Sequence, residues 1–365
     1  MAKKQPLVVG NLISVQDIMA WYEAYPLKPT KADASFPLVE NTKGKTWKTV
    51  SNASLNLNVM ADPISLNSKV PVDGRNGFKA IGGEMAPFGK GREMDADGIE
   101  KFEELKIHFA ELKNGANAAR LIAYYGDDLA YVRSACVNQK NYLSWALISS
   151  ACDLGFVTAN SPYMQGLANM DYAVEAWQKD VNATSWANAA SLIIDDIQSA
   201  LSLAKAQNKA FNTITINSIW FEYVRLNTQI QKYSATMVQN LYSTQTPPTL
   251  EAINTMLGQY FGKPIQFNVI DEDYTRMNLD GTATTANPFS DGVAVFSNTP
   301  LLGHFEWNRI PIIDPTLETI ESFFTVGSVT TVNPNMAETY SKGRGMPVID
   351  SFADNFYLKI NAIAW

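Results

Sequence analysis

The sequence is poor in the residues that metal and disulfide chemistry require. In 365 residues it contains two histidines, His108 and His304, and two cysteines, Cys136 and Cys152. A transition-metal site of the usual ligand composition is therefore nearly excluded, and two cysteines are too few for a disulfide scaffold. Both cysteines fall in a region with helical periodicity, so we expect reduced thiols in an apolar core.

Long apolar runs are also missing. No stretch of about 18 apolar residues occurs, so no membrane-spanning helix is expected. The apolar residues 7–9 are followed by Gly10 and Asn11 before a signal-peptide core can form, which argues against secretion. The glycines between residues 82 and 91 lack the strand before them and the helix immediately after them that a phosphate-binding loop needs, so they are expected to form an ordinary loop.

The acidic clusters and histidines have structural rather than catalytic explanations. Asp195 and Asp196 fit the solvated face of an amphipathic helix, and residues 271–273 fit a polar turn after a strand. His108 lies within a predicted helix, and His304 has no nucleophile near it in the sequence. The sequence therefore predicts no enzyme, no cofactor and no metal site.

Charge is distributed unevenly along the chain. Lys and Arg number 29 against 36 Asp and Glu, a net charge of −7. The first 92 residues hold 12 basic and 7 acidic side chains (+5), which leaves 17 basic and 29 acidic side chains (−12) for the rest. The acidic total argues against a dedicated nucleic-acid binder. The asymmetry favours docking of the front of one copy on the body of another, in a salt-dependent manner.

The first 92 residues are predicted to lack a core of their own. Prolines at positions 26, 29 and 37 prevent a continuous helix or central strand, so residues 1–44 are expected to form an extended arm with one short helix. Residues 45–92 alternate in hydropathy and are rich in glycine, which is typical of a long hairpin. Such a hairpin is stable only when it packs on another body.

Helices dominate the next part of the chain. A helix is expected to begin near Asp95 or Asp97 and to end at Asn114, before a second helix over residues 117–152. Those 36 residues span roughly 54 Å, which is longer than a compact domain of this size is wide. Helices and strands alternate from 185 to 270, which indicates an α/β unit.

Several segments of the second half share an order with one known family. They comprise Asp195 to Ile197 followed by 212–220, then 227–230, 249–254 and 265–274, and finally 333–336, 345–350 and 356–360. Together with the arm, hairpin and long helix, this order resembles the major capsid proteins of tailed double-stranded DNA bacteriophages. These proteins have the Hong Kong 97-type fold, and the similarity is to the branch of the lambda major head protein.

The resemblance implies an α+β fold with five parts. Residues 1–44 would be the N-terminal arm, 45–92 the extended β-hairpin called the E-loop, and 93–182 the peripheral domain with the spine helix. Residues 183–315 would form the α/β axial domain, and 316–365 would be C-terminal strands that return to the peripheral domain.

The resemblance also implies a structural role. The subunit would self-assemble into hexamers and pentamers of an icosahedral head that encloses double-stranded DNA, within a virion assembled in the bacterial host cytoplasm. Its partners would be itself, a scaffold protein and the portal during assembly, and a decoration protein, with DNA near it only non-specifically and no membrane. Because only some 40 residues precede the hairpin, we expect a separate scaffold protein and no N-terminal trimming.

Contacts between subunits are expected in the front segment. Its large apolar side chains have no core nearby in sequence, so burial against neighbouring copies would drive assembly. Its lysines are expected to be exposed and available to a neighbour. The predicted contact residues are Trp21, Phe36, Trp47, Leu57, Lys69 and Lys79.

Two other functions are compatible with the sequence. An encapsulin-like nanocompartment shell uses the same fold and would hold a cargo protein instead of a genome. A carbohydrate-binding protein would use some of the 8 Trp and 15 Tyr as sugar platforms, but it would need paired carboxylates in a cleft.

Overall fold

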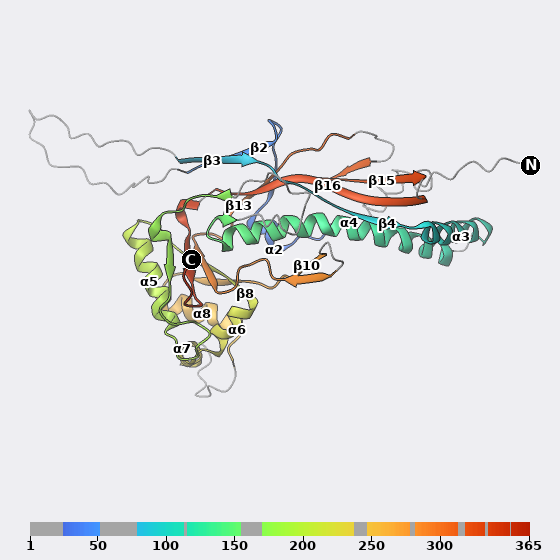
Figure 1. The fold of residues 1–365 in the computed structure, drawn as a ribbon. Coiled ribbons are helices and arrows are strands. Elements are labelled where there is room, and N and C mark those ends of the chain that lie inside the picture. Colours follow the sequence, from blue (N-terminus) through green and yellow to red (C-terminus); the bar gives the residue numbers. More distant parts are fainter. Residues whose placement is uncertain are drawn as a thin grey trace, which may run out of the picture.

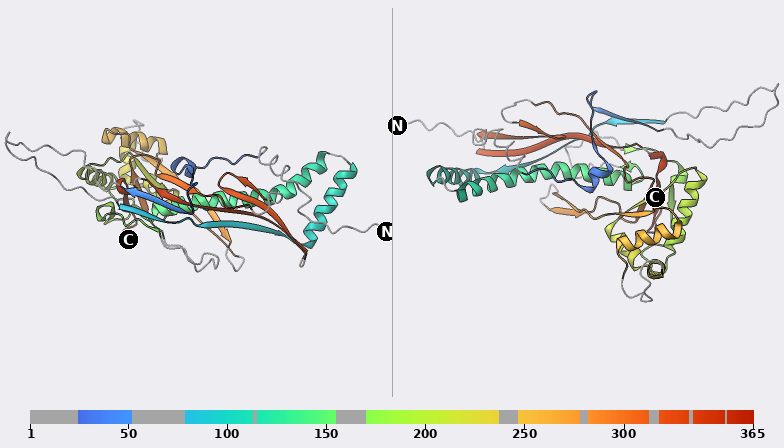
Figure 2. Two further views of the ribbon diagram at one scale, coloured as in Figure 1. Left: turned by 90° about the horizontal axis from the view of Figure 1, so that it is seen from above. Right: turned by 180° about the vertical axis from the view of Figure 1, so that it is seen from behind.

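The computed structural model shows an elongated upper layer and a second unit beneath one end of it (Figure 1). The structure describes residues 25–51, 79–112, 115–154, 170–236, 247–277, 282–312, 318–332, 335–350 and 352–365. A long helix, α4 (Gly115–Ser149), runs along the upper layer. Views from above and behind place the hairpin of β2 (Thr46–Ser51) and β3 (Lys79–Glu84) toward one end of that layer and helix α3 (Ala96–Leu112) toward the other (Figure 2).

The predicted long helix is confirmed as α4 (Gly115–Ser149), with 35 residues. It begins two residues earlier than expected. It also ends three residues earlier than expected, because Ala151 and Cys152 adopt left-handed φ angles of 55° and 59° that do not continue a helix. The preceding helix α3 (Ala96–Leu112) agrees with the predicted start near Asp95. The backbone N–H of Gly98 donates to the Asp95 carboxylate at 2.8 Å, as expected for an N-cap.

A six-stranded sheet covers α4. Its central strand β16 pairs along its length with three partners, and two short strands complete the edges. The strands are β1 (Leu38–Glu40), β13 (Gly303–Trp307), β16 (Asn335–Ile349), β15 (Phe324–Val332), β14 (Glu318–Glu321) and β4 (Pro87–Met94). Strand β4 differs from the sequence prediction, which gave residues 45–92 to one hairpin. Here β2 pairs with β3 as far as Glu84, and β4 pairs with β16 instead.

The second unit is a five-stranded sheet in the order β7-β17-β12-β8-β9 with helices on one face. The strands are β7 (Lys179–Val181), β17 (Phe356–Lys359), β12 (Val293–Ser297), β8 (Thr213–Asn217) and β9 (Gln266–Ile270), and the helices are α5 (Ile193–Ala206), α6 (Ser218–Leu226), α7 (Thr228–Ser234) and α8 (Leu250–Phe261). The sequence placed all of 316–365 with the long-helix part. Strand β17 departs from this, because it lies between β7 and β12 in the second unit.

Shorter elements connect the two parts. They are the helix α2 (Lys31–Ser35), the 3-10 turns η3 (Ala176–Gln178) and η5 (Phe352–Asp354), and the strand pairs β2 (Thr46–Ser51) with β3 (Lys79–Glu84), β5 (Asp153–Leu154) with β6 (Met170–Asp171), and β10 (Tyr274–Met277) with β11 (Ala283–Ala286). The pair β10–β11 lies beneath α4 (Figure 1).

The five-stranded sheet separates two apolar cores. The helix-side core lies between the sheet and α5 to α8, and it includes Ile197, Ile214, Ile216, Phe221, Ile253, Phe267, Phe296 and Phe356. The shared core lies on the other face and joins the sheet to α4, the long sheet and the N-terminal segment, and it includes Ala32, Phe36, Trp47, Trp145, Ile148, Tyr172, Val295, Val348 and Tyr357. A third core holds the outer part of α4 against β15 and α3. The two units are therefore joined through packed side chains rather than by a linker.

Both cysteines are buried free thiols, as predicted. Burial raises the pKa of Cys136 and that of Cys152 to about 12, so neither is a reactive thiolate at neutral pH. Among the described residues, no helix has the length and apolar character needed to cross a membrane.

Candidate assembly surfaces

Two of the predicted contact residues are buried inside their own chain. Phe36 is fully buried and packs edge-on against Trp145 of α4, with ring centroids 5.9 Å apart. Trp47 is 4% exposed and stacks on Tyr172 at 5.7 Å. The reason given for placing Phe36 and Trp47 at a subunit contact, that they lack a core in their own chain, is therefore wrong. The shared core supplies their burial.

Of the other predicted contact residues, only Lys79 lies in the part of the chain that the structure describes. Trp21, Leu57 and Lys69 lie outside the described residues. Lys79 is the first residue of β3 and pairs in register with Ser51 of β2. Contacts to a second copy at these positions stay predictions.

The N-terminal segment is integrated into the sheet through its backbone. The N–H of Leu302 donates to the carbonyl of Ser35 at 3.0 Å, and the N–H of Phe305 donates to the carbonyl of Pro37 at 2.9 Å. Strand β1 then pairs in parallel with β13. The part of the predicted arm between α2 and β1 is therefore a structural component of this subunit.

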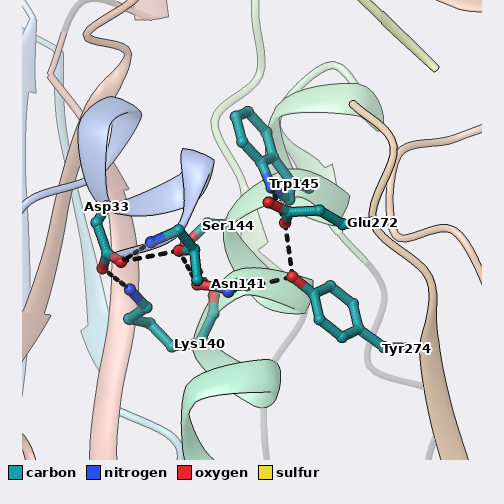
Figure 3. A network of polar contacts seen from close by, with 8 residues as sticks. Asp33, Lys140, Asn141, Ser144, Trp145, Glu272 and Tyr274 are labelled. Atoms are coloured by element: carbon teal, nitrogen blue, oxygen red, sulfur yellow. Dashed lines mark hydrogen bonds and ion pairs between the residues drawn. The ribbon is translucent and has the colours of Figure 1, made fainter. Parts of the chain in front are cut away.

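A buried polar junction fastens α2 to α4 (Figure 3). Lys140 of α4, only 1% exposed, forms an ion pair with Asp33 of α2. The Asp33 carboxylate also accepts from the Thr30 backbone N–H at 2.6 Å. Burial opposes ionisation of Asp33, but its bonds with Lys140 and Thr30 outweigh that effect and hold its pKa below the usual value. The junction keeps both charges paired in a place where an unpaired charge would be costly.

The same junction continues from α4 to the link between β9 and β10 (Figure 3). The Asn141 side-chain N–H donates to the Tyr274 hydroxyl at 3.1 Å, and that hydroxyl donates to the Glu272 carboxylate at 2.6 Å. The indole N–H of Trp145 donates to the same carboxylate at 3.3 Å. Residues 271–273, predicted to be a polar turn, form an irregular link between β9 and β10 instead, and Glu272 fixes this link to the long helix. No sequence motif marked these residues, because their spacing along the chain follows no pattern.

Asp196 corrects the sequence interpretation of the acidic pair on α5. Asp195 is exposed as expected, but Asp196 is half-buried and accepts from the Trp186 indole N–H and the Asn182 side chain, both at 2.8 Å. Burial raises the pKa of Asp196, with a smaller contribution from Asp195. Its role is to close the helix-side core around Trp186. Within the described part of the chain, no three His, Cys, Asp or Glu side chains gather to hold a metal ion.

His304 takes part in an ion pair at one end of β13. Its Nδ1 lies 2.9 Å from the Asp350 carboxylate. This hydrogen bond raises the pKa of His304, against a smaller opposing effect of burial. The pair clips β13 to the end of β16 and is accessible to solvent on the Asp350 side. His108 lies in α3.

Charge separates along the length of the molecule. Lys43, Lys45 and Lys48 are exposed at the base of the β2–β3 hairpin. Helix α3, toward the other end of the layer (Figure 2), exposes Asp97 and Glu100 among further acidic side chains. The exposed lysines at the hairpin base and the exposed acidic side chains of α3 are surfaces that one copy could present to another in head-to-tail order.

Large apolar side chains remain exposed on several elements. Two are on β1, and others lie on α5, α6, α8 and near the C-terminal end of the described chain. The most exposed are Ile363 (62%), Leu192 (58%), Tyr25 (58%), Ile107 (56%), Ile219 (55%), Leu301 (52%) and Leu226 (51%). Exposed apolar side chains that gather on one face are typical of protein contact surfaces.

Comparison with solved structures identifies the fold. The chain is similar to a protein described as a candidate prophage capsid protein of Escherichia coli CFT073, with a TM-score of 0.54 and 13% identity, over 95% of this chain and 99% of that chain. It is also similar to a phage-related protein of Bordetella bronchiseptica RB50, with a TM-score of 0.53 and 9% identity, over 97% of this chain and 99% of that chain. No family model matches the sequence, and a search of curated proteins found no similar sequence. The chain therefore has the Hong Kong 97-type phage capsid fold that its sequence predicted.

Proposed function

We propose that this chain is the structural subunit of a phage head. The observation that carries the proposal is the similarity of fold, over nearly the whole of both chains, to the candidate capsid protein of a prophage. Fold alone does not fix function, so the surfaces of this chain must also suit a shell. In this proposal the protein has no catalytic role and assembles with copies of itself into hexamers and pentamers that enclose double-stranded DNA.

The charge distribution supports repeated head-to-tail association. The hairpin base with Lys43, Lys45 and Lys48 and the acidic helix α3 lie toward opposite ends of the same layer. A surface whose two ends differ in charge attracts the next copy in one orientation and repels it in the other. Because these charges are exposed, salt screens their attraction, and assembly should weaken as ionic strength rises.

The net charge of −7 suits a shell that holds DNA without binding it tightly. A lining that does not neutralise phosphates releases few counterions and gives little non-specific affinity. The proposal includes a scaffold protein and the portal as assembly partners, a decoration protein on the outside, and the virion as the site of function, after assembly in the bacterial host cytoplasm.

The test is assembly of the full chain, expressed with and without a scaffold protein. Size-exclusion chromatography and negative-stain microscopy should show closed particles of uniform diameter, and cryo-electron microscopy should show six-fold and five-fold clusters of subunits. Monomers at every protein and salt concentration, with scaffold present, would contradict the proposal. Purified particles that contain a cargo protein and no nucleic acid would instead indicate a nanocompartment.

A further inference from the structure

Strand β13 carries two ionisable side chains on the face that the β2–β3 hairpin covers. His304 and Glu306 lie two residues apart on β13 and therefore project from the same side of the sheet. Their antiparallel partners on β16, Val348 and Met346, belong to the shared core together with Trp47 of the hairpin. Directly paired side chains share a face, so the base of the hairpin packs over the face from which His304 and Glu306 project.

Glu306 fastens the hairpin through one asparagine. The side-chain N–H groups of Asn41 donate to the Glu306 carboxylate at 2.7 Å and to the carbonyl of Thr46, the first residue of β2, at 2.8 Å. The side-chain carbonyl of Asn41 accepts from the backbone N–H of Lys43 at 2.8 Å. Asn41 thus fixes the turn by which the chain enters the hairpin, and the Glu306 carboxylate anchors that turn to β13.

His304 connects this face to the end of β16. Its Nδ1 lies 2.9 Å from the carboxylate of Asp350, which follows β16 and precedes the 3-10 turn η5 and strand β17 of the second unit. The hairpin reaches the same place, because the Thr49 hydroxyl donates to the carbonyl of Ile349 at 3.4 Å. The hairpin base, β13 and the passage to the second unit therefore meet here. The polar residues at this meeting point, which we call the His304 cluster, are Asn41, His304, Glu306 and Asp350.

The His304 cluster combines one imidazole with two carboxylates. The hydrogen bond to Asp350 raises the pKa of His304 against an opposing effect of burial, and the negative charges of Asp350 and Glu306 raise it further. Tyr172, which stacks on Trp47 beside the cluster, has its pKa raised by burial and stays neutral. The cluster therefore carries one net negative charge when His304 is protonated and two when His304 is neutral.

The other charged side chains of the surrounding elements do not compensate for this change. They are paired with each other, exposed to solvent or further along the sheet: Glu40 with Arg309, then Lys45, Lys48 and Glu84, and finally Arg344 opposite Pro87 of β4. Histidine changes its charge near neutral pH, whereas carboxylates do so in acid. His304 is therefore the member of the cluster whose titration alters the local charge around neutral pH.

We propose that protonated His304 holds the base of the β2–β3 hairpin against β13, and that the base loosens as the pH rises and His304 becomes neutral. Without the imidazolium, the carboxylates of Glu306 and Asp350 repel each other with no cation to offset them. Movement of Glu306 away from Asp350 weakens its hydrogen bond with Asn41 and therefore the turn that leads into the hairpin. The device lies within one subunit, so it operates whether or not the subunit builds a shell.

Hydrogen exchange of the full chain tests the coupling. Wild type and His304→Gln are compared at the same pH, which cancels the intrinsic pH dependence of exchange, and in the same state of assembly, which size-exclusion chromatography verifies. In peptides that cover residues 41–51 and 79–86, the variant should exchange about threefold faster than wild type at pH 5.5, a modest factor because Asp350 is exposed, and equally fast at pH 8.5. Equal exchange at pH 5.5, or the same difference at both pH values, would overturn the inference.

Two further variants show whether Glu306 carries the effect to the hairpin. Glu306→Gln removes the charge but keeps an acceptor for Asn41, so the addition of His304→Gln to it should change the exchange of the hairpin peptides at neither pH. Asp354→Asn is the matched control, because it removes a carboxylate of the same passage that pairs with Lys209 instead. It should leave the difference between wild type and His304→Gln intact. A pH-dependent difference that survives Glu306→Gln, or one that disappears with Asp354→Asn, would contradict the proposed coupling.

Titration of His304 by NMR provides a measurement that does not depend on the hairpin peptides. The chain has two histidines, so His108→Gln assigns the imidazole signal of His304. Asp350→Asn and Glu306→Gln should each lower the pH at which this signal titrates, since each removes a negative charge that favours the imidazolium. A midpoint that Glu306→Gln does not move would show that the two side chains do not interact, and the inference would then fail.

Discussion

The two cores on either side of the five-stranded sheet are built differently. The helix-side core draws most of its residues from a continuous region between Trp186 and Phe296, and polar contacts such as that of Asp196 with Trp186 lie at its border. The shared core collects residues from Ala32 to Tyr357 and is bordered by the polar junction of Asp33 and Lys140. Apolar packing is non-directional, whereas ion pairs and hydrogen bonds require particular angles. The helix-side core therefore stabilises one unit, whereas the shared core joins the two units to each other.

Large-to-small substitutions on either side of the sheet should separate the two roles most clearly. Trp145→Ala in the shared core and Ile253→Ala in the helix-side core each remove a fully buried side chain and should cost about 3–5 kcal/mol and about 2–5 kcal/mol of unfolding free energy, respectively. In peptide-level hydrogen exchange, Trp145→Ala should loosen α2 and the link between β9 and β10, and Ile253→Ala should not. If both variants change hydrogen exchange in the same regions, the two cores stabilise the same parts of the molecule and do not have separate roles.

Breaking the ion pair should have the next largest effect. Asp33→Ala leaves the Lys140 ammonium, which is 1% exposed, without its carboxylate. The expected loss of unfolding free energy is about 3 kcal/mol. This is the low end of the range for buried ion pairs, because the Asp33 side chain is 32% exposed. Chemical denaturation checks this value. The double variant Asp33→Ala/Lys140→Met should recover most of the loss, and no recovery would show that the charge itself is not what destabilises the single variant.

A milder change tests the far end of the junction. Tyr274→Phe removes the hydroxyl that donates to Glu272 and accepts from Asn141. The expected cost is about 1 kcal/mol, because one buried amide N–H is left without its acceptor. Thermal denaturation of Tyr274→Phe measures this cost, with Tyr233→Phe, on α7 of the second unit, as the control. If Tyr274→Phe lowers the stability no more than Tyr233→Phe does, the hydrogen bonds of the Tyr274 hydroxyl do not stabilise the junction.

The smallest effect is expected at His304. The pKa of His304 is raised in the folded state by its bond to Asp350, so protonated His304 stabilises the fold fully below its unfolded value of about 6.5. This stabilisation is lost as pH rises through the raised folded value. Because the Asp350 side chain is 58% exposed, it should not exceed about 1 kcal/mol. The unfolding free energies of wild type and His304→Gln, measured by denaturation, should differ at pH 5.5 and converge well above pH 7. A difference that stays constant with pH would contradict this prediction.

Elements with a strong local pattern could be predicted from the sequence. The long helix differs from its predicted bounds by two and three residues at its ends, because 35 residues of continuous periodicity leave little choice of structure. The alternation of helix and strand after residue 185 was equally clear, and the order of elements led to the correct fold. These features depend on residues that are close along the chain.

Features that depend on distant residues could not be predicted. Phe36 and Trp47 seemed to lack a core because their partners, Trp145 and Tyr172, are far along the chain. Asp196 was assigned to solvent because helical periodicity cannot show that Trp186 and Asn182 fold over it. The polar junction has no sequence signature for the same reason: its members come from three separate elements.

The place of β17 has a consequence for the timing of synthesis. This strand, Phe356–Lys359, follows the other four strands of its sheet in the sequence, yet it lies inside that sheet between β7 and β12. A ribosome that has translated only as far as residue 350 therefore holds a nascent chain whose second unit still has a gap where β17 belongs. Completion of that sheet therefore has to wait until residues 356–359 have been synthesised and have left the ribosome.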